Sequence, residues 1–544
     1  MTCRVRARAA RGEDSGAGLE RDPDIVGSCL EDAAHYTGGH AAAIAFPRTE
    51  ADVARLVRQS ARVLPIGAQS SVTGGATPMG EVVLSSSRMD SVLHLGTDRI
   101  RVEAGLPVAS LKQLLAAKGL YYPPAPTYDG AFVGGTIATN ASGAATFKYG
   151  STRQWVRALT VVLASGDVLE IERGQAGADE RGLFEIEASC GVLHVPVPAY
   201  TMPDVPKRSA GYHAEPGMDL VDLFVGSEGT LGVIVEVTLD LVAPPPAICV
   251  ALVPVASEPA GLGLVASLRE ESLATRRARD PRGLDVSAIE HMDRRSLQLL
   301  REDGADRKHG VSWPPATELL LLAQVELPPG TSAEEAFEHL SNAREPGAPD
   351  APLVRFCRIL DRFGAFDDTE VALPGDVRRA SQFFELREAV PSAVKHRIGI
   401  LKETVDPTIE KTAADMIVPF ERFGEMMEMY RRGYSERGLD YAIWGHISDA
   451  HVHPNVIPRS AAEMRSGREA ILEFGKRVVS LGGSPLAEHG VGRSSLKQAL
   501  LRLLYGDEGI EEMRAVKAAL DPTWKLSPGV LFPSPRHKGG ARLA

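Results

Sequence analysis

The sequence lacks the features that mark a membrane-spanning or secreted chain. Among its 544 residues, no apolar run approaches the roughly 18 residues that a membrane-spanning helix needs. Residues 1–12 carry Arg4, Arg6, Arg8 and Arg11 but no apolar stretch, which excludes a secretory signal. We expect a disordered N-terminal tail, with a transit peptide as the alternative. We therefore expect a cytoplasmic protein, and peripheral binding to a membrane stays open.

Basic charge and paired cysteines are also scarce. The net charge is −11, which excludes nucleic acid as the main partner because phosphate binding needs a basic face. The cysteines are odd in number and never stand two residues apart, so the chain holds no iron–sulfur motif of its own and fits a reducing compartment. They are Cys3, Cys29, Cys190, Cys249 and Cys357.

The chain is too long for one hydrophobic core, so two or three domains are expected. A run of three prolines at 244–246 is the clearest boundary. Segments with helical apolar spacing alternate with short apolar strands. We predict helices over 52–63, 108–118, 467–482 and 496–520, strands over 64–66, 232–242, 441–447 and 451–457, and a hairpin over 158–171.

Three segments are rich in glycine and small polar residues: 65–75, 133–143 and 225–232. Such loops can turn their backbone N–H groups outward, as a pyrophosphate site requires. None has the spacing of a Rossmann or Walker loop. Each segment alone is as well explained by a tight structural turn, but three of them in one region favour a ligand that approaches the backbone closely.

Histidines are concentrated in two short stretches, 445–455 and 487–492, of a chain with 14 histidines in all. The first contains His446, His451 and His453, and the second contains Glu488 and His489. Imidazole and carboxylate groups suit Zn²⁺ or a similar divalent ion. The alternatives are scattered surface histidines and ordinary core histidines.

The glycine-rich loops, in this order, resemble the FAD-binding domain of the vanillyl-alcohol-oxidase type of flavoprotein. The histidine-containing stretches resemble its D-2-hydroxy-acid dehydrogenase branch, which includes D-lactate dehydrogenases, the flavin subunit of glycolate oxidase and D-2-hydroxyglutarate dehydrogenase. The resemblance covers residues 35–533, and its segments are 134–143, 224–232 and 488–492, with 207–212, 520–522 and 527–529 in support.

The resemblance implies an α+β fold. Its parts are a two-part FAD-binding domain, an α+β cap domain that binds substrate, and a C-terminal segment that returns to the flavin. We place these parts at 35–245, 246–485 and 486–533, with an N-terminal tail and lead-in at 1–34 and a disordered tail at 534–544.

The resemblance also implies which residues contact FAD. The first two loops would hold the pyrophosphate and ribityl chain, and the third would lie against the dinucleotide. Some members of the wider fold attach FAD through a histidine in the first loop, and this loop has none, so we expect non-covalent FAD. The implied contacts are Pro65, Gly67, Ala68, Gln69, Ser70, Ser71, Thr73, Gly74, Gly134, Gly135, Thr136, Thr139, Asn140, Ser142, Gly143, Glu228, Gly229, Gly232, Val233 and Ile234.

In this branch the metal ligands correspond to His446, His453 and Glu488, and the general base to His489. Oxidation of a 2-hydroxy acid removes a hydride from Cα and a proton from the hydroxyl, so a base and nearby positive charge are needed. Arg387, in a segment that resembles the carboxylate-binding stretch, would pair with the substrate. A solvated arginine on a helix face is the alternative. We also expect Asp449 to orient a ligand histidine.

Three departures from the family pattern affect the site. The family usually has Gly-Asp-Gly-Asn where residues 448–451 read Ser-Asp-Ala-His, so His451 is either an extra ligand or reshapes the pocket. It also usually has Asn where Ser527 stands. Dicarboxylate-specific relatives tend to place a lysine just before the segment that starts at Asp415. Residues 412–414 are Thr-Ala-Ala here, which favours a short or apolar monocarboxylate.

The resulting hypothesis is an FAD-dependent D-2-hydroxy-acid dehydrogenase of the D-lactate or glycolate class, assisted by a divalent metal, with zinc as the expected ion. Its electron acceptor would be a quinone, a cytochrome or an iron–sulfur protein, and a homodimer is an open option. The rival hypotheses are a flavin-dependent transferase of the alkylglycerone-phosphate synthase kind and a non-catalytic flavin subunit of an electron-transfer complex.

Overall fold

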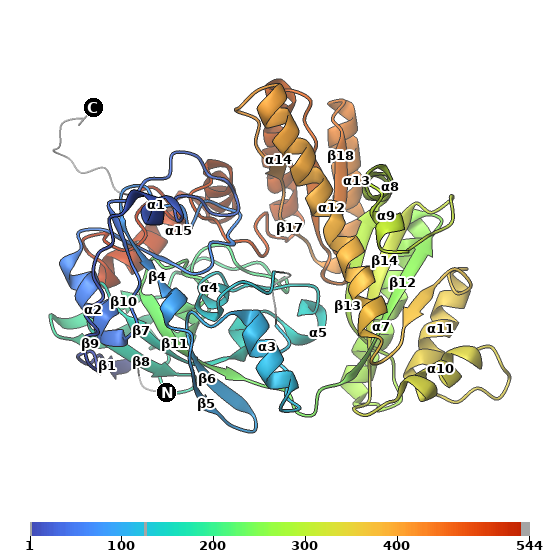
Figure 1. The fold of residues 1–544 in the computed structure, drawn as a ribbon, viewed down its shortest axis with the longest axis horizontal. Coiled ribbons are helices and arrows are strands. Elements are labelled where there is room, and N and C mark those ends of the chain that lie inside the picture. The colour runs from blue at the N-terminus through green and yellow to red at the C-terminus, as the bar shows by residue number, and fades with distance from the viewer. Residues whose placement is uncertain (1–2, 125–127, 535–544) are drawn as a thin grey trace.

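The computed structural model describes residues 3–124 and 128–534. The chain forms two lobes (Figure 1). One lobe contains the N-terminal half, in blue and teal, together with the red C-terminal segment, and the other contains the green to orange middle of the chain. Helices and strands both contribute to each lobe, which confirms the α+β prediction.

The N-terminal residues are ordered, so the prediction of a disordered tail is wrong for the described part of residues 1–12. Strand β1 (Arg4–Arg6) pairs in parallel with β9 (Leu183–Ala188), which in turn pairs with β10 (Gly191–Pro196). The arginines face carboxylates along the neighbouring strand: Arg6 bonds Glu187 at 2.8 Å. Opposite charges across a strand pair stabilise the pairing, which a count of charges in one segment does not reveal. Residues 535–544 of the predicted C-terminal tail lie outside the described residues.

A small parallel sheet, in the order β2-β4-β3, follows this segment. Its strands are Ala43–Ala45, Val82–Ser85 and Val63–Ile66, and α2 (Glu50–Gln59) joins the first strand to the last. The helix predicted over 52–63 starts earlier because Thr49 and Asp52 form a reciprocal capping box. It ends earlier because Ser60 is extended and Val63 already belongs to β3.

The first lobe also contains a five-stranded sheet in the order β5-β6-β11-β7-β8. Its central strand, β11 (Val233–Asp240), alternates buried and half-buried residues, as expected for a sheet with one face in the core. The strand predicted over 232–242 and the hairpin predicted over 158–171 are confirmed. The other strands are Val92–Leu95, Arg99–Glu103, Val156–Val162 and Val168–Glu172, and the helices of this lobe are α1 (Pro23–Gly27), α3 (Val108–Ala116), α4 (Val133–Ala138), α5 (Thr146–Tyr149) and α6 (Leu220–Phe224).

The second lobe, here called the cap, is built on an eight-stranded sheet in the order β15-β12-β14-β13-β18-β19-β16, with β17 also paired to β19. Strands β12 and β14 pair antiparallel along their whole length, from Ala247 opposite Leu327 to Val255 opposite Leu319. The strands are β12 (Ala247–Val255), β13 (Asp285–Asp293), β14 (Leu319–Leu327), β15 (Glu370–Ala372), β16 (Thr412–Ala413), β17 (Met416–Ile417), β18 (Tyr441–His446) and β19 (His451–Val456).

Helices cover the cap sheet. The longest is α12 (Val377–Thr404), which carries Arg387 and continues past Pro391. Helix α14 (Ala461–Ser480) confirms the helix predicted over 467–482 but starts earlier, at the Ser460 cap. The remaining helices are α7 (Glu258–Ala278), α8 (Arg294–Glu302), α9 (Ala305–Lys308), α10 (Ala333–Ser341), α11 (Pro352–Arg362) and α13 (Phe423–Glu436).

After α14 the chain returns to the first lobe (Figure 1). Helix α15 (Ser495–Leu520) confirms the last predicted helix, with a break at Gly506, whose φ is 72°. The segment beyond it lies beside β3, where Ser527 N donates to Val63 O at 2.8 Å. The return brings Glu488 and His489 to the junction of the two lobes.

Candidate functional site

A cavity of about 1040 Å³ lies at this junction. All three glycine-rich loops line it, and so do residues 28–35 of the N-terminal segment. Glu388 and Lys395 of α12 line it from the cap, and Glu488 and His489 line it from the returning segment. The loops that the sequence singled out therefore share one cavity with side chains that are distant in sequence.

Most of the predicted FAD contacts line this cavity. Thr73, Gly74, Asn140 and Gly143 do not. The Thr73 carbonyl instead accepts the backbone N–H of Arg493 at 3.0 Å. The predicted residues that line the cavity are Pro65, Gly67, Ala68, Gln69, Ser70, Ser71, Gly134, Gly135, Thr136, Thr139, Ser142, Glu228, Gly229, Gly232, Val233 and Ile234.

Each loop contains one non-glycine residue with a left-handed backbone: Gln69 (φ 51°), Asn140 (φ 47°) and Glu228 (φ 52°). Such a conformation costs free energy and persists only where the surroundings enforce it. The Gln69 side chain bonds the carbonyls of Cys29 and Ala76, at 2.9 and 2.8 Å. The other two also bond distant backbone: Asn140 accepts Arg153 N, and Glu228 accepts Val491 N and Gly492 N. Each loop conformation is thus held by hydrogen bonds of one of its own side chains.

A glycine on the wall of the cavity leaves room for a ligand such as FAD. In helix α4, a Cβ on Gly135 would meet no protein atom within 4 Å, so this glycine leaves open space. Its neighbour Gly134 is different, because a Cβ there would lie 2.6 Å from Ala104 Cβ. One glycine therefore allows close packing and the other keeps the cavity open.

The histidines of the first stretch are brought together by a tight turn between two paired strands. His446 ends β18 and stands opposite His451 of β19, and His453 projects from the same face two residues later. The turn passes through Ala450 in the left-handed region (φ 57°), where the family pattern usually has glycine. All three imidazoles are buried.

Glu488 reaches this group from the returning segment. Its Oε1 lies 3.4 Å from His446 Nε2 and 3.3 Å from His453 Nε2. In a tetrahedral site with bonds of about 2.0–2.1 Å, two ligand atoms lie about 3.3 Å apart. The distances from Glu488 Oε1 to both imidazole nitrogens therefore match the ligand spacing of a zinc-like ion. Together with His451, the three predicted ligands have ligand atoms that all lie within 4.8 Å of one another.

Glu290 of β13 orients the first of these histidines. His446 Nδ1 lies 2.8 Å from Glu290 Oε1, which leaves Nε2 directed at Glu488. Burial alone would raise the pKa of Glu290, but the charges of Arg387 and His446 hold it well below its usual value. The expectation that Asp449 plays this role is wrong: Asp449 lies 3.4 Å from Lys207 and bonds no histidine among the described residues.

Arg387 lies beside this pair and is buried. Its Nε donates to Glu290 Oε2 at 3.1 Å, and its Nη1 donates to Glu388 Oε1 at 2.6 Å. Two carboxylates thus pair with the predicted substrate-binding cation. Lys395, two turns later on α12, is an exposed cation that lines the cavity.

Asp415 organises the predicted base. Its Oδ2 lies 3.1 Å from His489 Nδ1 and accepts the His489 backbone N–H at 3.0 Å. Its Oδ1 lies 2.9 Å from His451 Nε2, and Lys497 Nζ lies 3.3 Å from Oδ2. Burial opposes ionisation, but His489 and Lys497 hold the pKa of Asp415 well below its usual value. A carboxylate that fixes one imidazole nitrogen leaves the other free to act, as in hydrolase triads.

Sequence reasoning missed Glu290, Asp415 and Lys207. Glu290 had a weak signal, because it is a carboxylate that follows the two apolar residues 288–289 in β13. Asp415 is a carboxylate directly before the short apolar strand β17. Lys207 stood in a recognised segment but nothing in its neighbours indicated a contact with Glu488.

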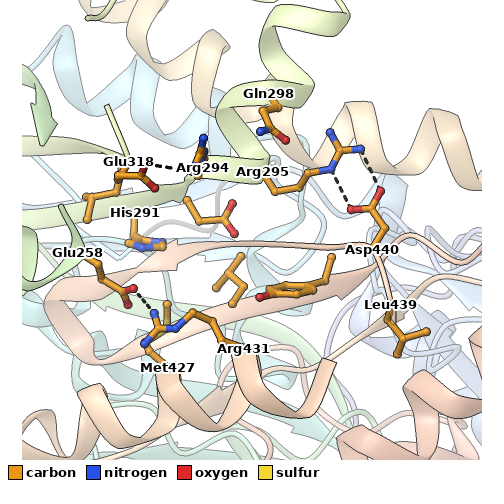
Figure 2. Close-up of a pocket in the computed structure, with 14 residues that line it drawn as sticks. Glu258, His291, Arg294, Arg295, Gln298, Glu318, Met427, Arg431, Leu439 and Asp440 are labelled. Atoms are coloured by element: carbon orange, nitrogen blue, oxygen red, sulfur yellow. Dashed lines mark hydrogen bonds and ion pairs between the residues drawn. The ribbon is translucent and has the colours of Figure 1, made fainter. Parts of the chain in front are cut away.

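A second cavity, of about 340 Å³, lies in the cap, where His291 of β13 lines it (Figure 2). Its arginines are already paired: Arg294 with Glu318, Arg295 with Asp440, and Arg431 with Glu258. None of the three glycine-rich loops lines it. The chemistry is therefore concentrated at the lobe junction.

Comparisons with known proteins agree with this arrangement. Residues 41–172 match the FAD binding domain family, and residues 257–531 match the family described as FAD linked oxidases, C-terminal domain. In the described residues, no helix combines the length and apolar character needed to cross a membrane.

Three relatives match along most of their length. A D-2-hydroxyglutarate dehydrogenase from Xanthomonas citri pv. viticola is 29% identical over 90% of this chain and 89% of its own. A glycolate oxidase subunit from Bacillus subtilis is 26% identical, covering 91% and 90%. A D-lactate dehydrogenase from Anaerostipes hadrus is 26% identical, covering 86% and 83%.

Among solved structures, 4-ethylphenol oxidase from Gulosibacter chungangensis superimposes with a TM-score of 0.62 at 16% identity, covering 95% of this chain and 94% of that one. An alkyldihydroxyacetonephosphate synthase gives a TM-score of 0.60 at 14% identity, covering 94% and 82%. At these identities the likeness concerns the fold alone.

Proposed function

The chain belongs to the FAD-linked oxidases, and from that premise we propose that it oxidises a D-2-hydroxy acid of the lactate or glycolate class to the 2-oxo acid. The observation that carries the proposal is that one cavity joins the two parts of the site. The three glycine-rich loops line this cavity, and so do Glu488 and His489, which also belong to the histidine–carboxylate cluster. The relatives named above are dehydrogenases or oxidases of 2-hydroxy acids, which supports this substrate class.

When bound, FAD supplies the acceptor for the hydride that leaves the substrate Cα. We assign to His489 the removal of the proton from the substrate hydroxyl. Its Nδ1 is held by Asp415, and its Nε2 lies 3.6 Å from Glu488 Oε1, beyond hydrogen-bond distance. The ring is about one-third exposed and lines the cavity, so Nε2 is available to a substrate. The role of Asp415 is to fix the tautomer and orientation of the ring and to stabilise the imidazolium that forms.

A substrate carboxylate needs a cation. We assign this to Arg387, whose guanidinium is fixed by Glu290 and Glu388 at the edge of the cluster. Because both partners are carboxylates, Glu388 must turn away before a substrate can form two bonds with this arginine. Lys395 is placed to attract the anion into the cavity.

We also infer that His446, His453 and Glu488 hold a divalent ion, with zinc as the expected metal. When bound, such an ion lowers the pKa of a coordinated hydroxyl. Glu290 fixes His446 for this purpose. Chelation of the purified enzyme should abolish turnover and leave FAD in place, and Zn²⁺, Mn²⁺ or Co²⁺ should restore it. Full activity of exhaustively metal-free enzyme would remove this part of the proposal.

FAD is proposed to be held without a covalent bond. The described histidines that line the cavity are His35 and His489, and the first loop contributes none. Acid precipitation should therefore release the flavin into solution. Flavin that stays with the precipitate would show a covalent link.

The substrate class is tested by steady-state turnover with an artificial electron acceptor. A panel of D- and L-2-hydroxy acids and glycolate should show activity with D-lactate or glycolate and none with the L-enantiomers. The physiological acceptor is expected to be a quinone, a cytochrome or an iron–sulfur protein. Activity restricted to L-acids, or to no 2-hydroxy acid, would contradict the assignment.

A further inference from the structure

Lys207 is a fully buried lysine at the centre of the cluster. Its Nζ lies 2.9 Å from Glu488 Oε2, 3.1 Å from His451 Nδ1 and 3.4 Å from Asp449 Oδ2. A lysine ammonium can donate three hydrogen bonds, and here two of them reach Glu488 and His451. Asp449 pairs with the charge of the ammonium without a hydrogen bond.

His451 has both ring nitrogens committed. Its Nε2 lies 2.9 Å from Asp415 Oδ1, which assigns the ring proton to Nε2. Its Nδ1 faces the ammonium of Lys207, which can only donate, so Nδ1 must accept. The lone pair that would bind a metal is therefore occupied by Lys207. This position carries the residue that departs from the family pattern.

The two oxygens of Glu488 have different surroundings. Oε1 lies 3.3–3.4 Å from the Nε2 atoms of His446 and His453. Oε2 is the acceptor of Lys207 and also lies 3.4 Å from Ser142 Oγ. Among the described residues, the oxygen that faces the imidazoles has no lysine or arginine partner, and the other oxygen is paired with Lys207.

We propose that Lys207 is an internal competitor for the cation: it holds one oxygen of Glu488 and the lone pair of His451, and so limits the metal to three protein ligands and weakens its binding. The proposal for Lys207 rests on the metal site proposed above. The consequence is chemical, because a fourth protein ligand would fill a tetrahedral shell and leave no position for a substrate. His451 is then a positioning residue for Lys207 and not a metal ligand.

The test is the affinity of the FAD-containing, chelated protein for Zn²⁺, measured by titration calorimetry on the wild type and on Lys207→Met. Removal of a like charge beside the ion, together with release of His451 Nδ1, should tighten zinc binding by about tenfold or more. X-ray absorption at the zinc edge should show one additional nitrogen ligand. Lys497→Met is the matched control, since Lys497 contacts Asp415 and not Glu488, and its zinc affinity should change much less.

A second variant tests the role of His451 without burying unpaired charge. His451→Asn should retain zinc within about tenfold of the wild type and with the same ligand number, whereas His453→Asn should lose about 100-fold or more. FAD content and melting temperature establish that each variant is folded.

Zinc binding by Lys207→Met that is equal to or weaker than that of the wild type would overturn the inference, as would no binding by either protein. A loss in His451→Asn as large as that in His453→Asn would also overturn it. Tighter binding by Lys207→Met supports it, including the case in which the wild type binds no zinc. The test measures zinc affinity and not turnover. A wild-type enzyme that stays active without metal would contradict the proposed catalytic role of the metal, but it would not show whether Lys207 weakens metal binding.

Discussion

The two halves of the site are built on different principles. The flavin side consists of short contiguous loops whose small residues expose backbone, and each loop is held by one side chain that bonds a distant backbone group. The cluster side consists of charged and imidazole side chains from the strands β13, β18 and β19, Asp415 and the returning segment. The first kind of site tolerates changes of charge and depends on space. The second tolerates little change of charge because its groups are buried together.

The largest expected effect is on the cluster side. His489→Asn should slow flavin reduction by about 10²–10⁴-fold, the range for a lost general base, with little change in substrate affinity. Stopped-flow reduction of the flavin checks this. Because His489 follows Glu488, metal and FAD content must be measured on the same sample. Near-normal reduction with normal metal and FAD would remove His489 as the base.

A pair of neighbouring glycines tests whether space governs the flavin side. Gly134→Ala should destabilise the protein by about 1–3 kcal/mol, because the new Cβ would overlap Ala104. Gly135→Ala should not destabilise the FAD-free protein, since its Cβ would meet no protein atom, but it should weaken FAD binding. Thermal unfolding of the FAD-free variants and flavin titration separate the two effects. Equal destabilisation by both would contradict the distinction between packing and open space.

The smallest effect concerns Glu228, which joins the third loop to the returning segment. Burial raises its pKa to about 7, although the N–H groups of Val491 and Gly492 and the charge of Lys497 oppose the shift. The folded state then binds more protons than the unfolded state between pH 4.5 and 7, so this group's contribution to stability is greatest below that window and falls as pH rises through it.

Glu228→Gln should therefore flatten the decline in stability between pH 5 and 7, by an amount of the order of 1 kcal/mol. Chemical denaturation of both proteins across this range is the measurement. The variant's overall stability is expected to be lower, because one backbone N–H loses its acceptor, so the slope with pH is the readout. Identical slopes would show that Glu228 keeps an ordinary pKa.

The contrast also explains what the sequence could predict. The flavin loops are contiguous, so their composition alone indicated a ligand site, and most of the implied contacts line the cavity. Helices with clear caps and the strands around the histidines were predicted within a few residues. The residues that complete the cluster could not be found in this way. Glu290, Asp415 and Lys207 reach it from separate parts of the chain, and their roles depend on contacts that only the fold creates.

The expectations that were wrong also concern contacts between residues distant in sequence. Asp449 is adjacent in sequence to the histidines but faces Lys207, while Glu290 takes the orienting role from another strand. The N-terminal arginines were expected in a disordered tail because each was counted alone. Their partners, such as Glu187, lie far along the chain.

The most direct test of the central claim is anaerobic mixing of the oxidised, FAD-containing protein with single enantiomers of 2-hydroxy acids, followed by flavin absorbance. The site described here should pass a hydride from a D-2-hydroxy acid to the flavin, so D-lactate or glycolate should bleach the yellow absorbance within the dead time of manual mixing. L-lactate should leave it unchanged. A flavin that no 2-hydroxy acid bleaches, in protein with its metal and FAD in place, would contradict the account.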